Sequence, residues 1–188
     1  ITALNYLSYA LKGNPYMGVG RNMAYKKSLF FKGKGFASHM HILSGDDDLF
    51  VNQNATGTNT RIEIDFDSHV WSEPKNSLSS YFSQKFRHQG AGKAYKSSHK
   101  KMLGMQVLSG FLFYVFIIAL IVIKADWWII AAFYSIRLLS QIMVYIPVLK
   151  KLKYIDLIWW VPVFDFIYYF YIVFLNFIAL FRKRVEWK

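Results

Sequence analysis

Three long apolar segments fill the second half of the chain and constrain its fold more than any other feature. Residues 106–123, 127–149 and 154–181 carry no charge, one charge and two charges, respectively. A hydrocarbon core about 30 Å thick needs about 20 apolar residues per helix, and each segment is near that length or longer. Tryptophans lie near the segment ends or flanks, as interfacial aromatics do: Trp127, Trp128, Trp159, Trp160 and Trp187. We therefore predict three membrane-embedded helices, because a soluble helical hairpin would leave too little polar surface.

Composition changes near residue 104. The first part mixes Gly, Asn, Ser and charged residues, whereas Phe, Ile, Leu, Trp and Tyr dominate afterwards and account for most of the 54% hydrophobic content. The change predicts three regions: a polar part over residues 1–77, a basic helical region over 78–104, and a membrane region over 105–188. The chain has no cysteine, which excludes disulfides and thiolate metal sites.

Positive charge is concentrated just before the first apolar segment. The chain has a formal net charge of +12, yet no acid lies between Pro74 and Ala125. The basic residues that precede the segment are Lys75, Lys85, Arg87, Lys93, Lys96, Lys100 and Lys101. Next to a membrane span, such a cluster favours contact with anionic lipid headgroups over nucleic acid, for which no groove-reading motif is present. The positive-inside rule then places the first half in the cytoplasm.

The same rule makes the third segment ambiguous. It puts the turn at residues 124–126 outside and the lysines of residues 150–153 inside. It also puts residues 182–184 inside, although a single crossing separates its two ends. The length of the segment, with Pro162 and Asp165 interrupting it, allows a re-entrant or interfacial first part, and a full crossing stays open as the alternative. A cysteine introduced at Val185 and labelled from outside only would instead indicate three full crossings.

Arg137 lies near the middle of the second apolar segment, where a charge costs about 2.5–3.5 kcal/mol on insertion scales. Asp165 is the acid at similar depth in the third segment, so we predict that the two side chains pair. Two alternatives remain open: each charge reaches a headgroup separately, or Arg137 binds the phosphate of a lipid-linked acceptor.

Three adjacent acids, Asp46, Asp47 and Asp48, follow Gly45 and precede an apolar run. One reading is a helix start, since aspartate caps free backbone N–H groups and suits the helix dipole. One carboxylate is enough for capping, however, and neighbouring carboxylates repel each other. The carboxylates beyond the one needed for capping favour a role in binding a cation, in accepting a proton or in a reaction.

Two further patterns lie between the acids and the membrane. Residues 61–67 alternate between apolar and polar side chains, which predicts a half-buried strand. A helix is predicted from Leu78 to His88, with Tyr81, Gln84, Arg87 and His88 on one face. An amide and a guanidinium one turn apart can bind the same anion, although a basic helix lying on the membrane explains the pattern too.

Four pieces together resemble the C-terminal half of membrane-bound family-two glycosyltransferases, which include cellulose, hyaluronan and ceramide-glucoside synthases. They are Gly18–Tyr25 (GVGRNMAY), Asp46–Asp48, Ser72–Pro74 (SEP) and Gln84–His88 (QKFRH). The resemblance covers roughly residues 14–101. It implies that the polar part is the α/β portion of a GT-A catalytic domain, incomplete at its N-terminus and followed by membrane helices.

The resemblance implies a catalytic role for the acid cluster. The family has a Glu-Asp or Asp-Asp motif whose second acid is the general base. Asp46, Asp47 and Asp48 match it, and the register leaves Asp47 or Asp48 as the base, with Asp47 favoured.

The resemblance also implies substrate-binding residues. Gln84 and Arg87 match a Gln-x-x-Arg-Trp motif that lies over the nucleotide diphosphate, while Gly20 and Asn22 belong to a matching substrate-binding stretch. His88 replaces the Trp that lies near the acceptor sugar in polymer synthases. This departure favours transfer of a single sugar over processive synthesis.

The implied function is inverting transfer of a sugar from a nucleotide-sugar donor to a glycan or lipid-linked acceptor hydroxyl, at the cytoplasmic face of a bacterial inner membrane. The family's nucleotide-binding strands and its Asp-x-Asp motif, which binds Mg²⁺ or Mn²⁺, are expected upstream of this sequence. No metal ligand is therefore predicted within the chain. The competing interpretation is a non-catalytic membrane anchor whose basic helix binds anionic lipid.

Overall fold

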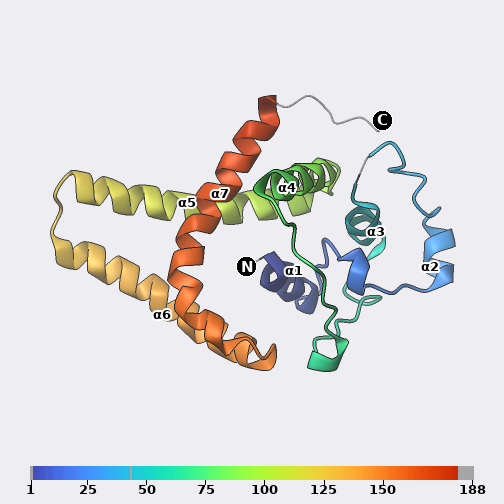
Figure 1. Ribbon diagram of the computed structural model, residues 1–188, viewed down its shortest axis with the longest axis horizontal. Coiled ribbons are helices and arrows are strands. Elements are labelled where there is room, and N and C mark those ends of the chain that lie inside the picture. The colour runs from blue at the N-terminus through green and yellow to red at the C-terminus, as the bar shows by residue number, and fades with distance from the viewer. Residues whose placement is uncertain (1, 43, 182–188) are drawn as a thin grey trace. The chain divides into compact units, whose positions relative to one another are not determined.

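The computed structural model describes residues 2–42 and 44–181, and its regular elements are helices (Figure 1). In chain order they are α1 (Thr2–Leu11), η1 (Gly20–Asn22), α2 (Lys27–Lys32), α3 (Asp46–Asn54), η2 (Phe66–Ser68), α4 (Leu78–Gly92), α5 (Ser97–Val122), α6 (Trp127–Lys151), η3 (Ile155–Trp160) and α7 (Val161–Phe181), where η marks a 3₁₀ helix.

The prediction of an α/β GT-A portion is wrong for this structure, because the described residues contain no strand. The alternating stretch before Phe66 is irregular, and Phe66–Ser68 forms a 3₁₀ turn. Alternation shows only that two faces differ in polarity. A strand also needs a neighbouring strand to take up its backbone N–H and C=O groups, and no described segment supplies one.

Three helical segments are long and apolar enough to cross a membrane, which confirms the prediction from apolar length. They are Ser97–Val122, Trp127–Lys151 and Ile155–Ala179. The first of these helices begins at Ser97, before the apolar stretch that starts at residue 106, and includes the basic residues Lys100 and Lys101. Many of their large apolar side chains are exposed, for example Phe116, Ile136 and Phe177, as expected for surfaces that lipid covers.

The third segment is not one continuous α-helix. Its first six residues form η3, and α7 begins at Val161. Pro162 lies in the first turn of α7, where its missing N–H would have no partner within the helix. Residues 182–184 and the labelling position Val185 lie outside the described residues.

The chain divides into two compact units, with the main boundary between Leu103 and Gly104. The first unit has a core of Tyr16, Leu49, Ala91 and Tyr95, contributed by a loop, α3, α4 and the segment before α5. Gly45 adopts a left-handed φ of 96°, and a Cβ there would collide with Ala91. Glycine at this position therefore allows α3 to start directly against α4.

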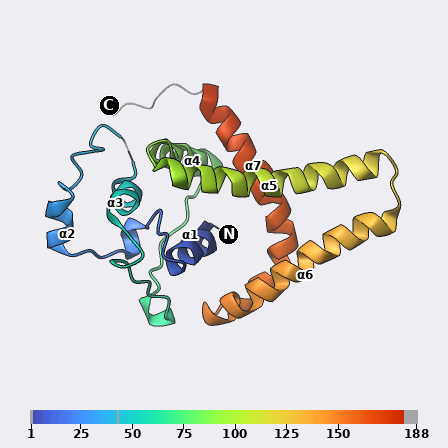
Figure 2. The ribbon, with the colours of Figure 1, turned by 180° about the vertical axis from the view of Figure 1, so that it is seen from behind.

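The second unit is built on α5, α6 and most of α7. A short turn over residues 123–126 joins α5 and α6, and α7 crosses α5 in both views (Figures 1 and 2). Gly110 of α5 lies directly against the ring of Tyr169, and Phe111 packs edge-on against Phe170. A small residue at a helix crossing lets the two backbones approach closely.

Candidate functional site

The three acids occupy the first turn of α3, and their environments differ. Asp46 is exposed, Asp47 is half-buried and Asp48 is only 5% exposed. Gly45 is the N-cap residue and has no side chain to cap the helix. Acids in the first turn suit the helix dipole, but their different burial gives each one different chemistry.

Asp47 joins α3 to the 3₁₀ turn η1. Its Oδ2 accepts a hydrogen bond from the backbone N–H of Gly20 at 2.7 Å, and its Oδ1 accepts one from the N–H of Asp48 at 2.9 Å. A Cβ at Gly20 would lie 3.1 Å from Oδ2 of Asp47. The close approach explains glycine at this position, and it brings together two of the pieces that the sequence analysis selected.

Asp48 lies beneath the surface against two tyrosines. The pKa of Asp48 is raised to about 7, chiefly by burial and secondly by the charge of Asp47, while a hydrogen bond from the Tyr95 hydroxyl opposes the rise. Burial and the nearby Asp48 charge also raise the pKa values of Tyr6 and Tyr95. Near neutral pH, both the protonated and the ionised form of Asp48 are therefore populated.

The helix α4 brings the Gln-x-x-Arg pattern to the same place. Gln84 is half-buried, while Arg87 and His88 are exposed one turn further along. Partial burial lowers the pKa of His88, Arg87 lowers it further, and Asp47 opposes the shift. His88 therefore lies within electrostatic range of both Arg87 and Asp47, in mainly neutral form at pH 7.

The Gly20 turn is also tied to the segment before α4. Arg21 donates from Nη1 to the hydroxyl of Ser72 at 2.6 Å and contributes to the lowered pKa of His88. Asn22 lies in the same turn as Gly20 and is exposed. The structure thus gathers the glycine turn, the acids and the Gln84–His88 helix, which lie far apart in sequence.

Three residues of this site were missed by the sequence analysis: Tyr6, Arg21 and Tyr95. Tyr95 is an uncharged aromatic residue between Lys93 and Lys96. An aromatic residue among charged neighbours is the one local signal in the sequence that Tyr95 is buried. Arg21 lies within the selected stretch Gly18–Tyr25 but was not singled out there, and Tyr6 stands in no pattern that distinguishes it.

No group of three or more His, Asp and Glu side chains suited to an ion occurs within residues 2–42 and 44–181. No step of the chemistry is therefore assigned to a metal held by these residues.

Replacing Asp48 by Asn should stabilise the protein at high pH. The pKa of Asp48 is raised from 3.8 to about 7 on folding. Between these values the folded state keeps a proton that the unfolded state releases, so the free energy of unfolding falls as pH rises and stays low above pH 7. Asparagine imitates the protonated form, so Asp48→Asn should gain about 2–4 kcal/mol over wild type above neutrality. The gain should shrink towards acid pH.

Thermal unfolding of both proteins across this pH range measures the effect. Asp46→Asn is the matched control, because it removes the same charge from the same helical turn at an exposed position. A stability difference between Asp48→Asn and wild type that does not change with pH would contradict the prediction.

The second unit contains the intramembrane ion pair predicted from the sequence. Arg137 of α6 contacts Oδ2 of Asp165 of α7 through Nη2 at 2.8 Å and donates to it from Nε at 2.9 Å. The Tyr114 hydroxyl of α5 donates to the same oxygen. The pairing is confirmed, and separate contact of each charge with headgroups is wrong, because Asp165 is only 4% exposed.

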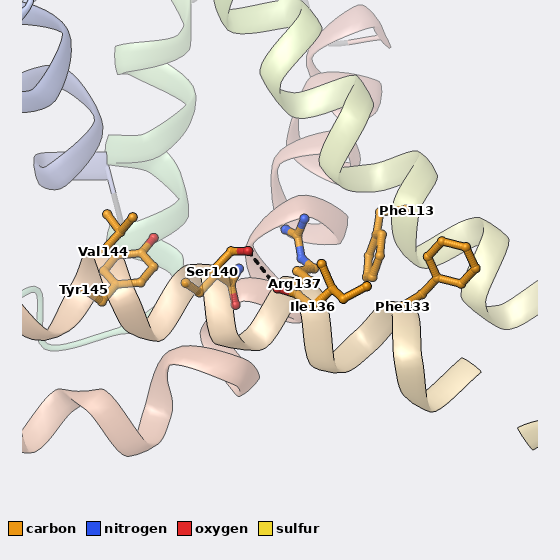
Figure 3. Close-up of a pocket in the computed structure, with 8 residues that line it drawn as sticks. Phe113, Phe133, Ile136, Arg137, Ser140, Val144 and Tyr145 are labelled. Atoms are coloured by element: carbon orange, nitrogen blue, oxygen red, sulfur yellow. Dashed lines mark hydrogen bonds between the residues drawn. The ribbon is translucent and has the colours of Figure 1, made fainter. Parts of the chain in front are cut away.

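A shallow cavity of about 470 Å³ adjoins this ion pair on the α5–α6 side (Figure 3). Its lining residues are Phe113, Phe133, Ile136, Arg137, Ser140, Gln141, Val144 and Tyr145. The Arg137 guanidinium lies over the ring of Phe113, 4.7 Å from its centroid, and Ser140 donates to the carbonyl of Ile136. The Arg137 guanidinium is thus in contact with protein groups. These contacts do not test the alternative that Arg137 binds the phosphate of a lipid-linked acceptor.

No family model, curated protein or solved structure matches the chain.

Proposed function

We propose that the protein takes part in transfer of a sugar from a nucleotide-sugar donor to an acceptor hydroxyl at the cytoplasmic face of a membrane. The observation that carries the proposal is the meeting of Gly20, Asp47 and the Arg87–His88 turn of α4. His88 thus interacts electrostatically with the carboxylate of Asp47 and with the guanidinium of Arg87. These are the groups that such a transfer needs: one to take a proton and one to bind a diphosphate.

In the proposed reaction Asp47 is the general base. The acceptor oxygen attacks the anomeric carbon as its proton passes to a carboxylate oxygen of Asp47. The bond between the anomeric carbon and the diphosphate oxygen breaks on the opposite side. The bonding pair leaves with the diphosphate, and the configuration at the anomeric carbon is inverted.

Burial favours Asp47 over Asp48 as the base. Asp48 is 5% exposed and hydrogen-bonded by Tyr95, so its carboxylate is out of reach of a substrate hydroxyl. Asp47 is half-buried and lies at the surface end of the turn. Asp48 instead sets the local charge, because its protonation determines whether Asp47 alone or both Asp47 and Asp48 are negatively charged.

Arg87 is proposed to bind the leaving diphosphate. Its guanidinium is exposed and can form two parallel hydrogen bonds to phosphate oxygens. Gln84, one turn earlier on α4, can add an amide donor to the same anion. His88 in its neutral form can accept from or donate to a sugar hydroxyl, which suits transfer of one sugar.

Arg87→Lys should weaken binding of a nucleoside diphosphate by about tenfold, because lysine keeps the charge but loses the paired donors. Isothermal titration of the full-length protein with uridine and guanosine diphosphates measures the change. Arg61→Lys is the matched control: Arg61 is exposed and donates to the carbonyl of Thr60, away from the acids. Affinity unchanged in Arg87→Lys would remove the diphosphate role.

The direct test is transfer itself. Membranes with the full-length protein would receive radiolabelled nucleotide sugars, and labelled glycan or glycolipid and free nucleoside diphosphate would be measured together. Release of nucleoside diphosphate in the same amount as labelled product supports sugar transfer. If none of the donors yields labelled product while the protein still binds anionic vesicles, a membrane anchor is favoured.

A further inference from the structure

A buried polar network lies behind the acid cluster, on the same face of α3. Asp48 and Asn52 are one helical turn apart, and both face inward; Asn52 is 0% exposed. A fully buried amide must satisfy its donors and acceptor within the protein. The partners of Asn52 therefore show what fixes this face of α3.

Asn52 is held by two segments distant in sequence. Its Nδ2 donates to the carbonyl of Tyr16 at 2.7 Å and lies 3.0 Å from Nδ1 of His99, while its Oδ1 accepts from the backbone N–H of Lys96 at 2.9 Å. Tyr95, directly before Lys96, donates its hydroxyl to Asp48. The five residues from Tyr95 to His99 thus contact both buried polar side chains of α3.

These bonds fix the protonation of His99. The Nδ2 of Asn52 has only hydrogens to offer, so Nδ1 of His99 must accept. The Nε2 of His99 then carries the proton and donates to Oδ1 of Asn14, 2.9 Å away. Asn52 cannot turn over to suit a protonated His99 without losing the bond from Lys96. The charged group facing His99 is Lys96, and the ring of Tyr16 packs beside it.

We propose that His99 is a positioning residue, which through Asn52 holds the start of α3, and so Asp47 and Asp48, in the arrangement needed for transfer. The proposal rests on the proposed function for its effect on turnover. His99 belongs to the first turn of α5, the first membrane helix. The hydrogen bond from Asn52 to His99 therefore ties the acid-bearing helix to the start of that apolar helix.

Two substitutions separate the two bonds of His99. In His99→Asn the side-chain oxygen can occupy the place of Nδ1 and accept from Asn52, while the bond to Asn14 is lost. In His99→Gln the side-chain nitrogen can occupy the place of Nε2 and donate to Asn14, while the bond to Asn52 is lost. Each variant keeps one hydrogen bond and is neutral, so each is the control for the other.

We expect His99→Gln to lower kcat for transfer by about 10- to 100-fold, since small misplacement of a catalytic group has effects of that size. His99→Asn should stay within about threefold of wild type, and KM for the donor should change in neither, because donor contacts are unaffected. Equal loss in both variants, equal retention, or loss in His99→Asn alone would overturn the proposal.

A second readout does not depend on transfer. Infrared difference spectra, with Asp48→Asn to assign the band, follow the carbonyl stretch of protonated Asp48 as pH is varied. His99→Gln should lower the titration midpoint by about one pH unit or more, because a loosened α3 start admits water to the carboxyl group. His99→Asn should leave the midpoint unchanged.

An unshifted midpoint in His99→Gln would overturn the anchoring role whatever the transfer assay gives. If wild type transfers no sugar from any donor, the proposed function fails while the infrared midpoints still decide the role of His99.

Discussion

Asp47→Asn in the full-length protein is expected to lower sugar transfer by at least about 100-fold, the low end of what a general base contributes. Asparagine has the same shape, and its side-chain oxygen can still accept from the N–H of Gly20, so the link to the Gly20 turn should persist although the bond from the N–H of Asp48 is lost. What it loses is the capacity to take a proton from the acceptor hydroxyl. Initial rates with a labelled donor, beside membrane insertion and thermal unfolding of the variant, measure the effect.

Asp46→Asn gives the sharpest comparison, since it removes the same charge from the same turn of α3. An equal loss in Asp46→Asn would point to the charge of the helix start instead of a specific base. Near-normal turnover in both Asp47→Asn and Asp48→Asn would end the assignment of the acids to catalysis.

Arg137→Leu is expected to destabilise the second unit by about 3–5 kcal/mol, because it leaves Asp165 buried without its cation. Tyr114 still donates to the carboxylate but cannot balance its charge. The double variant Arg137→Leu with Asp165→Leu removes both charges and should recover most of the stability. Unfolding of the three proteins in the same detergent measures the effect.

The comparison between single and double variants decides between two explanations. A double variant at least as unstable as Arg137→Leu would show that stacking of the Arg137 guanidinium over the rings of Phe113 and Tyr169 matters more than charge balance. Asp165→Leu alone should also be destabilised, since it leaves the guanidinium unpaired.

Some features of this protein follow from the sequence because their causes are local. The length of an uncharged apolar run sets the membrane helices, and the acids after Gly45 set the start of α3. The Arg137–Asp165 pair was predictable for a related reason. A charge at that depth needs a partner, and the sequence offered one acid at similar depth.

The predicted strand over residues 61–67 shows where local pattern is insufficient. Alternation gives the polarity of two faces, but the energy of a strand comes from hydrogen bonds to another segment. Which segments pair is a property of the whole chain. The described residues form a helical fold with a turn at Phe66–Ser68 in place of that strand.

The different environments of the three adjacent acids were likewise decided by tertiary structure. Asp46, Asp47 and Asp48 are identical in type and adjacent, so the sequence alone left the register of the base open. Burial raises the pKa of Asp48, although the hydrogen bond from Tyr95 opposes the rise, while Asp47 is half-buried and accepts from the N–H of Gly20. The burial of each acid depends on residues distant in sequence: Gly20 lies 27 positions before Asp47, and Tyr95 lies 47 positions after Asp48. The sequence by itself thus determined that acids gather at a helix start before a membrane region, and only the fold distinguished one acid from the next.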